Sequence, residues 1–203
     1  MILVRHAKPL VAPGVCYGAL DVAADPDATR QVAVALAKKL PHHATVMAST
    51  LQRCELLAQF LQGLRPDLTY KTDARLAEMN FGSWEGQRWD SVPQQAFDAW
   101  TADFWLHRFG GSESVAEFMA RVALAWQDVP AESNDSAASP AHVWITHAGV
   151  IRAMNLIVMG QREVHDAALW PAVAPAYGEA WCVPLGVTPK MQTYLPESAR
   201  RVD

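Results

Sequence analysis

The start of the chain constrains the fold most, because a buried strand is predicted there and two basic side chains follow it. Residues 2–4 form an apolar run that ends directly in Arg5 and His6. A short apolar run bounded by polar residues is typical of a buried β-strand. In open α/β sheets, ligands bind just beyond the carboxyl ends of such strands. Arg5 and His6 therefore lie where a binding site is expected, although His6 taken alone favours a purely structural hydrogen bond.

Short apolar runs alternate with helical patterns along most of the chain. Strand-like runs lie at residues 2–4, 44–48, 68–72, 143–146 and 179–185, and helical spacing of apolar residues covers 26–40, 51–64, 115–126 and 150–158. Strands separated by helices favour parallel pairing, because a parallel crossover needs a connection of about that length. We therefore predict an α/β fold, a three-layer α/β/α sandwich around a mostly parallel central sheet.

An aromatic-rich insertion interrupts this alternation. We predict that residues 78–130 form a small helical cap on a single domain, residues 1–203, and that residues 186–203 form a loosely ordered tail. Residues 130–140 are rich in Ser, Asn, Asp and Ala, which is typical of an exposed loop. The aromatic side chains at helical spacing are Phe97, Trp100, Phe104 and Trp105. This spacing favours packing within the cap over stacking on a flat substrate.

The composition excludes several classes of partner. The 203 residues carry a formal net charge of −4, so a broad basic face for nucleic acid is not expected. Apolar runs are too short to span a bilayer, and the amino terminus lacks the pattern of a signal peptide. The three cysteines, Cys16, Cys54 and Cys182, have no metal-ligand spacing and cannot pair completely. We therefore expect reduced thiols in a cytoplasmic protein.

Polar and basic side chains follow three of the predicted strands. Arg5 and His6 end the first strand, Ser49 and Arg53 follow the second, and His147 follows the fourth. If these strands are parallel neighbours, the side chains meet at one edge of the sheet, together with two helix amino termini. Two arginines beside two histidines favour an anion, and the planar guanidinium fork suits phosphate oxygens. Structural ion pairs are the alternative role for the arginines.

Chemistry at such a phosphate site needs a nucleophile and an acid. A neutral imidazole nitrogen of His6 can attack phosphorus, and nearby arginines favour that neutral form. Glu78 is the best candidate for protonating the leaving oxygen, because it follows the third strand and precedes the insertion. Glu85 is the rival acid, and a cap or salt bridge is the structural alternative for Glu78. Glu113 either pairs with a site arginine or only begins a helix.

Five segments carry a family resemblance. They are Leu3-Val4-Arg5-His6, Ser49-Thr50-Leu51-Gln52-Arg53, Leu76-Ala77-Glu78 with Phe81-Gly82-Ser83-Trp84-Glu85-Gly86, Gly110-Gly111-Ser112-Glu113-Ser114, and Thr146-His147-Ala148-Gly149-Val150-Ile151-Arg152. In this order they resemble the histidine phosphatase superfamily, also called phosphoglycerate-mutase-like. The resemblance implies that His6 is the phosphorylated nucleophile and Glu78 the proton donor. It also implies that Arg5, Arg53 and His147 bind phosphate, that His147 shares in catalysis, and that no metal or other cofactor is needed.

One branch of this superfamily is the most similar. The segments Gly14-Val15-Cys16-Tyr17-Gly18 and Thr146-His147-Ala148-Gly149 resemble α-ribazole-phosphatase-like proteins, which are linked to cobalamin synthesis. The resemblance implies a phosphomonoesterase for a small-molecule phosphate ester, with α-ribazole 5′-phosphate as one candidate. Tyr17, Cys16 and Ala148 are the expected substrate contacts. Ala7-Lys8-Pro9 follow His6 where the commonest family pattern has glycine and then Glu-Thr, so the usual contacts of that loop do not carry over.

Three other functions stay open. Phosphoglycerate-mutase-type transfer needs cations for a substrate carboxylate, and residues 77–127 contain only Arg88, Arg108 and Arg121 as basic side chains apart from histidine. A metal-dependent hydrolase is disfavoured, because the site arginines would repel a cation. A non-catalytic phosphate-binding module is disfavoured by the complete set of site residues. A homodimer is also left open, since no segment shows a clear interface pattern.

Overall fold

The computed structural model of the chain describes residues 1–130, 141–183 and 192–193. Its strands are β1 (Ile2–Arg5), β2 (Thr45–Ala48), β3 (Thr69–Thr72), β4 (His142–Thr146), β5 (Ala180–Cys182) and β6 (Gln192–Thr193), and its α-helices are α1 (Pro26–Ala37), α2 (Gln52–Leu64), α3 (Gln94–Ala102), α4 (Val115–Gln127) and α5 (Ala148–Val158). Among these described residues, no helix has the length and apolar character needed to cross a membrane. Apart from residue 130, the predicted loop 130–140 lies outside the described residues.

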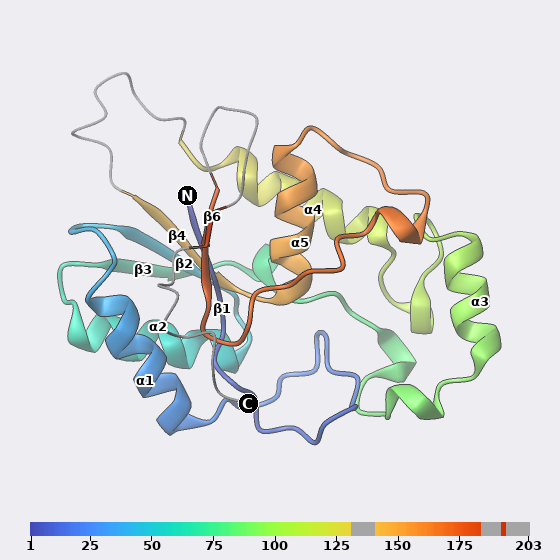
Figure 1. Cartoon of the computed structure of the whole chain (residues 1–203), viewed down its shortest axis with the longest axis horizontal. Helices are drawn as coiled ribbons and strands as arrows, with labels where there is room; N and C mark the ends of the chain where they lie inside the picture. Colours follow the sequence, from blue (N-terminus) through green and yellow to red (C-terminus); the bar gives the residue numbers. More distant parts are fainter. Residues whose placement is uncertain (131–140, 184–191, 194–203) are drawn as a thin grey trace.

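The strands form one sheet in the order β3-β2-β4-β1-β5-β6 (Figure 1). The first four of these run parallel, whereas β5 and β6 pair antiparallel at one edge. The register pairs Arg5 with Thr146, and Ala48 with Ile145. The carboxyl ends of β1, β2 and β4 therefore lie side by side, which confirms the arrangement that the sequence predicts.

Helices cover both faces of the sheet and make the predicted three layers. Because side chains alternate along a strand, Leu3 packs in the core beneath α4 and α5, whereas Ile2 and Val4 pack in the core beneath α1 and α2. Figure 1 shows α1 and α2 on one side of the sheet and α4 and α5 on the other. The prediction of an α/β/α sandwich is confirmed. One strand was missed, because β6 lies within the predicted tail 186–203.

Local sequence signals set the beginnings of two helices. Asp25 accepts hydrogen bonds from the backbone N–H groups of Asp27 and Ala28, at 2.9 and 3.1 Å, and so caps α1. Ser114 and Glu117 form a reciprocal capping box at α4. Both signals are visible in the sequence, because these side chains satisfy the free N–H groups of a first helical turn.

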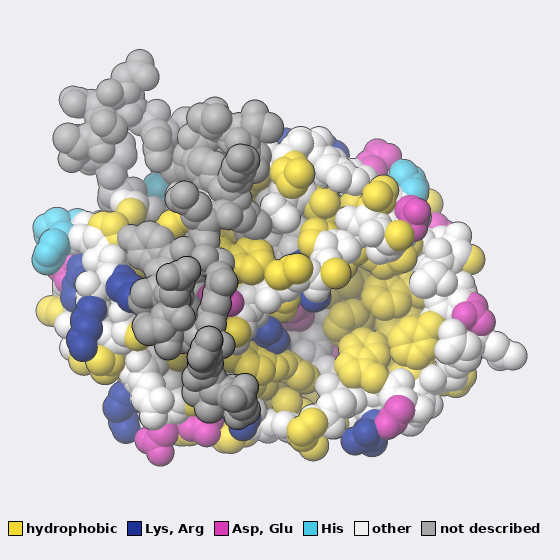
Figure 2. Space-filling view, in the orientation of Figure 1, with side chains coloured by type: hydrophobic (Ala, Val, Ile, Leu, Met, Phe, Trp, Pro, Cys, Tyr) yellow, Lys and Arg dark blue, Asp and Glu magenta, His cyan; other side chains and the backbone are white. Residues whose placement is uncertain are grey.

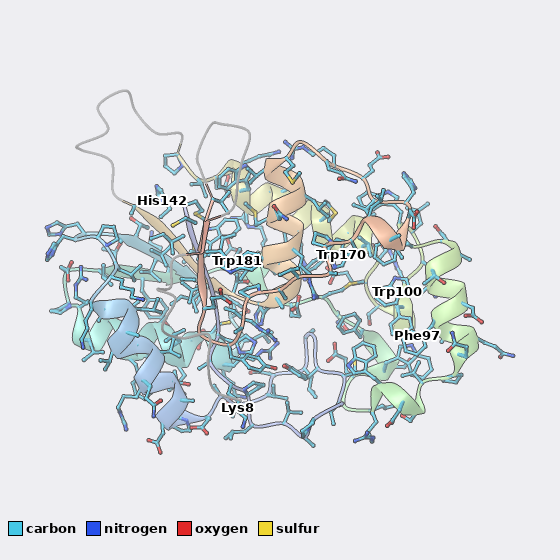
Figure 3. All side chains as sticks on the ribbon, in the orientation of Figure 1. Lys8, Phe97, Trp100, His142, Trp170 and Trp181 are labelled. Carbon is cyan, nitrogen blue, oxygen red and sulfur yellow. The ribbon has the colours of Figure 1, made fainter. Side chains whose placement is uncertain are left out.

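The insertion between β3 and α4 contains α3 and several single turns, and most of its aromatic side chains pack together around Phe109. The ring of Phe109 lies 4.5 Å from that of Trp100 and 5.4 Å from that of Phe97, between ring centres. Helix α3 ends at Ala102, so the predicted helical stripe breaks before Phe104. Figure 3 shows Trp100 on the inner side of α3, in the region between α3 and Trp170.

Candidate active site

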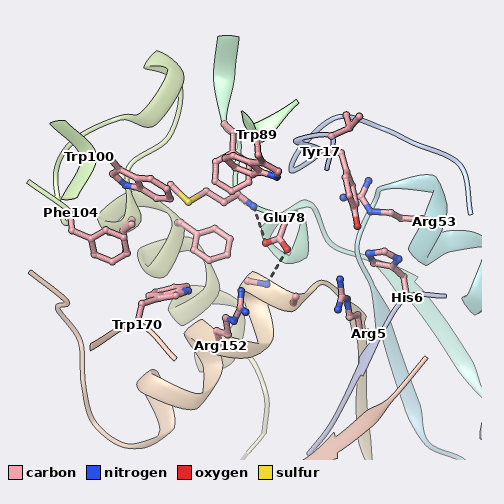
Figure 4. A pocket seen from close by; sticks show the side chains of 17 residues that line it. Arg5, His6, Tyr17, Arg53, Glu78, Trp89, Trp100, Phe104, Arg152 and Trp170 are labelled. Carbon is pink, nitrogen blue, oxygen red and sulfur yellow. Dashed lines mark hydrogen bonds between the residues drawn. The ribbon is translucent and has the colours of Figure 1, made fainter. Parts of the chain in front are cut away.

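A cavity of about 390 Å³ lies beyond the carboxyl ends of the parallel strands. Its basic end is formed by Arg5, His6 and Arg53. Its aromatic end is lined by Phe81, Trp89, Trp100, Phe104, Phe118 and Trp170. Figure 4 shows Glu78 and Arg152 between the two ends, and Figure 2 shows a hollow with largely hydrophobic walls beside the cap. The cavity therefore joins an anion-binding end to an apolar end.

His6 lies at the basic end with its ring almost fully buried. Its Nδ1 is 2.7 Å from the carbonyl oxygen of Ala7. Since a carbonyl only accepts, Nδ1 carries the proton and Nε2 holds the lone pair. Burial, followed by the charge of Arg53, lowers the pKa of His6 to about 3; Arg5 adds to this, while the bond to Ala7 opposes it. The ring is therefore neutral at pH 7, with Nε2 as its nucleophilic atom.

His147 is fully buried, and its ring centre lies 5.1 Å from that of His6. Arg53 Nε donates to His147 Nδ1 at 3.3 Å. Burial first, and then the charge of Arg53, lowers the pKa of His147 far below its usual value. The neutral ring therefore carries its proton on Nε2, which donates to Ser49 Oγ at 2.8 Å. His147 lies beside His6 as predicted, but its contact with phosphate stays a prediction, because both ring nitrogens are engaged.

The two arginines at the basic end are held in different ways. Arg53 is fully buried, and its two terminal nitrogens donate to the carbonyl groups of Leu20 at 2.9 Å and Gly18 at 2.6 Å. Arg5 donates from one terminal nitrogen to the carbonyl of Pro175 at 2.8 Å. Its buried Nε has no hydrogen-bond partner among the described residues. Because a buried N–H without an acceptor is costly, this end of the cavity suits an anionic oxygen.

The geometry separates the two candidate acids. Glu78 lines the cavity and accepts hydrogen bonds from the N–H of Gly149, at 2.9 Å, and of Met79, at 3.1 Å (Figure 4). Glu85 accepts from four backbone N–H groups, three of them in residues 18–20, and does not line the cavity. Glu85 therefore anchors the loop that Arg53 also binds, and Glu78 is the better candidate acid.

The other residues singled out in the sequence have mixed outcomes. Tyr17 and Ala148 line the cavity, as the expected substrate contacts should. Cys16 is fully buried and is not part of the lining, so its expected substrate contact stays a prediction. Its neighbour Tyr17 reaches the cavity instead, because successive side chains of this extended loop point in different directions. Glu113 pairs with Arg121, at 2.7 Å, and not with an arginine of the cavity.

Sequence reasoning missed several side chains of the site. Trp100 and Phe104 pack in the cap as predicted, but both also line the cavity, which their spacing does not indicate. Arg152 also lines it, and its place just over one turn after His147 on α5 was a usable signal. Trp170 and Tyr177 come from the irregular segment after α5, where no periodic pattern marks them. Tyr177 covers Arg5, with its ring centre 3.9 Å from the guanidinium carbon.

Comparisons with known proteins agree with the fold described above. A family model described as the histidine phosphatase superfamily (branch 1) matches residues 1–169. Among curated proteins, none matches the chain significantly. Solved structures with a similar fold include a mycobacterial glucosyl-3-phosphoglycerate phosphatase, with 22% identity, a TM-score of 0.71, and 89% of this chain and 87% of that chain covered. A phosphoglycerate mutase from Thermus thermophilus has 24% identity, a TM-score of 0.65, and coverage of 90% and 91%.

At these identities the solved structures show a shared fold, and the family match carries the assignment. It spans most of the chain and includes the carboxyl ends of β1, β2 and β4 beside the cavity, from Arg5 to His147. The resemblance expected from the sequence motifs is thus confirmed, and the chain belongs to the histidine phosphatase superfamily.

Proposed function

We propose that this protein is a phosphomonoesterase that hydrolyses a small-molecule phosphate ester through a phosphohistidine on His6. The observation that carries this proposal is the cavity itself. A neutral imidazole and two arginines occupy one end, Glu78 lies in the middle, and aromatic rings form the other end. A phosphoryl group, a leaving oxygen and an apolar alcohol half fit these regions in that order.

The first chemical step is transfer of the phosphoryl group to His6. Arg5 and Arg53 bind the phosphoryl oxygens and stabilise their charge in the transition state. Nε2 of His6 forms a bond to phosphorus while the bond from phosphorus to the leaving oxygen breaks. Glu78, in its protonated form, gives its proton to that oxygen, so that a neutral alcohol leaves. The Nδ1–H bond to Ala7 stabilises the positive charge that develops on the imidazole.

The second step returns His6 to its starting state. The Glu78 carboxylate takes a proton from a water molecule, whose oxygen attacks phosphorus. The bond from phosphorus to Nε2 breaks, its electron pair returns to the ring, and inorganic phosphate leaves. Glu78 is then protonated again, so one residue serves as acid and base in turn.

The charges around the cavity favour hydrolysis over phosphoglycerate-mutase-type transfer. The three arginines of the cap pair with carboxylates: Arg88 with Asp90, Arg108 with Glu117, and Arg121 with Glu113. None of the three lines the cavity. Beyond the basic end, Arg152 is the one cation that the described residues contribute to the lining, which is otherwise dominated by aromatic rings. A small doubly anionic substrate finds little to bind there.

The aromatic end favours a substrate whose alcohol half carries a flat or apolar group. Trp100 and Phe104 lie 5.5 Å apart between ring centres, and Phe104 and Trp170 lie 6.0 Å apart. These rings pack against one another and present an aromatic surface to the cavity, which a flat group of the substrate can contact. α-Ribazole 5′-phosphate, the candidate suggested by the sequence motifs, has a flat base of this kind, so we propose it as the first substrate to test.

A panel of esters tests this proposed function. We expect phosphates of ring-bearing alcohols, α-ribazole 5′-phosphate first among them, to exceed glycerate phosphates in kcat/KM by about 2- to 10-fold, the range that an aromatic contact supplies. Trp100→Ala should raise KM for ring-bearing esters only. Trp105→Ala is the matched control, because it removes an indole from the same cap but not from the cavity. A preference for glycerate phosphates would favour the mutase alternative, and binding without turnover would favour a non-catalytic module.

Gly149 supplies a second prediction, because it sets the position of Glu78. A Cβ at Gly149 would lie 2.2 Å from Oε1 of Glu78, so Gly149→Ala must displace the carboxylate. We expect kcat for alkyl phosphates to fall by roughly 10- to 100-fold, since misplacing a catalytic group by about 1 Å has effects of this size. Gly63→Ala is the matched control, because a Cβ there meets nothing within 4 Å. Equal kcat values for the two variants would contradict this role of Gly149.

A further inference from the structure

A turn at residues 175–179 lies against the end of β1, beyond the part of the chain that the family model matches. The N–H of Gly178 donates to the carbonyl groups of both Arg5 and His6, at 3.1 Å each. The carbonyl of Pro175 accepts from the Arg5 guanidinium at 2.8 Å. Gly178 has φ +75°, and a Cβ there would lie 2.3 Å from a side chain of α1. Backbone hydrogen bonds therefore fix this turn to Arg5 and His6, which line the basic end of the cavity.

Tyr177 projects from this turn onto the basic end. Its ring centre lies 3.9 Å from the guanidinium carbon of Arg5 and 5.7 Å from the ring centre of His6. Its hydroxyl oxygen is 2.6 Å from that of Tyr17. The ring of Tyr17 in turn lies 5.5 Å from the guanidinium carbon of Arg53. One pair of tyrosines thus contacts both arginines and adjoins the proposed nucleophile.

We propose that Tyr177 is a positioning residue of the phosphate site, which fixes the plane of the Arg5 guanidinium with its ring and fixes Tyr17 with its hydroxyl. The Pro175 carbonyl holds one terminal nitrogen of Arg5 and the Tyr177 ring covers one face, so the guanidinium has one orientation. Its remaining donors, Nε among them, then point in fixed directions toward a phosphate. This inference rests on the proposed function, because the anion that it serves is the phosphoryl group.

The hydroxyl pair also supplies a hydrogen-bond donor. Two hydroxyls have two protons, and the bond between Tyr17 and Tyr177 uses one of them. Burial first, and then the bond to Tyr177, raises the pKa of Tyr17, so Tyr17 stays protonated at neutral pH. When Tyr177 is the donor in this bond, the proton of Tyr17, which lines the cavity, is free for a phosphoryl oxygen at the basic end.

The test compares variants that remove the ring with variants that remove only a hydroxyl. Tyr177→Leu removes both the ring over Arg5 and the hydroxyl that bonds Tyr17. Tyr177→Phe keeps the ring and removes only the hydroxyl. Tyr17→Phe removes the other hydroxyl of the same hydrogen bond. Tyr177 is 41% exposed, so its shortening opens no core cavity, and a melting temperature for each variant checks the fold. Tyr70→Leu and Tyr70→Phe are the matched controls, because Tyr70 lies on the edge strand β3, which two strands separate from β1 and Arg5.

The readouts are the Kd of inorganic phosphate by calorimetry and kcat and KM for the best ester. Tyr177→Leu should weaken phosphate binding about 10-fold, the scale of a well-placed cation–π contact, and raise KM in parallel. Tyr177→Phe should lose only about 3-fold, the scale of one hydrogen bond. The double variant Tyr17→Phe with Tyr177→Phe should bind phosphate no more weakly than the weaker-binding single variant. Each single variant already loses the hydrogen bond between the two hydroxyls, so the second substitution cannot remove it again.

The results distinguish this inference from the proposed function. If Tyr177→Leu binds phosphate as tightly as Tyr70→Leu does, the inference is wrong while hydrolysis by the wild type stands. Fully additive losses in the double variant would also overturn it. If the wild type binds phosphate but hydrolyses no ester, the proposed function fails, and the Kd values still decide the role of Tyr177. Should Tyr177→Leu fail to fold, the two phenylalanine variants and their double variant decide it.

Discussion

His6→Ala should abolish hydrolysis of phosphate esters, with a loss in kcat of about 10⁴-fold or more, while the fold persists. The substitution removes Nε2, the neutral nitrogen that attacks phosphorus, so no phosphohistidine can form at this position. The arginines remain, so binding of inorganic phosphate should weaken far less than kcat falls. The side-chain hydrogen bond of His6 goes to its neighbour Ala7 and joins no distant elements. Initial rates on the best ester, with a melting curve for each protein, measure this.

The matched control for this substitution is His42→Ala. The side chain of His42 is 87% exposed and lies outside the cavity lining. It should keep the kcat of the wild type. A His6→Ala protein within about 10-fold of the wild type would rule out nucleophilic catalysis by His6, because loss of a covalent nucleophile costs far more.

Glu78→Gln has the second largest expected effect, and its size should depend on the leaving group. The amide keeps the size of the side chain and one acceptor oxygen for the N–H of Gly149, but it cannot give up a proton. For alkyl phosphates we expect kcat to fall by about 10²- to 10⁴-fold, the usual contribution of a general acid. For p-nitrophenyl phosphate, whose leaving group needs no proton, the first step should be nearly unaffected in a single-turnover measurement.

Glu163→Gln is the control for this experiment, because Glu163 is an exposed carboxylate that pairs with His165 away from the cavity. It should change neither rate. If Glu78→Gln slows both classes of ester equally in the first step, the side chain positions the substrate and does not act as the leaving-group acid.

The strand ends of the site were predictable from the sequence, and the reason is local. Arg5, Ser49 and His147 each follow a short apolar run, and the helices between those runs favour parallel pairing. Parallel order then brings the three strand ends to one edge of the sheet. The choice of Glu78 over Glu85 depends on tertiary contacts, because the amides of residues 18–20 bind Glu85 and the amide of Gly149 binds Glu78.

The aromatic end and the tyrosine pair were beyond the reach of sequence patterns. Trp100 and Phe104 share a helical spacing in the chain, but α3 ends between them, and tertiary packing turns both toward the cavity. Trp170 and Tyr177 lie in a segment without hydrophobic periodicity. Its path is set by backbone contacts such as those of Gly178 with Arg5 and His6. Such contacts join residues far apart in sequence and leave no local signal.

The central claim is a covalent bond between phosphorus and Nε2 of His6. Rapid quenching of the enzyme with its best ester, followed by mass spectrometry of peptides kept at alkaline pH, tests it most directly. We expect a phosphoryl group on His6 at Nε2, which forms before phosphate is released, is lost in acid and is absent from His6→Ala. Turnover with no phosphorylated peptide, or with the phosphoryl group on His147, would contradict it.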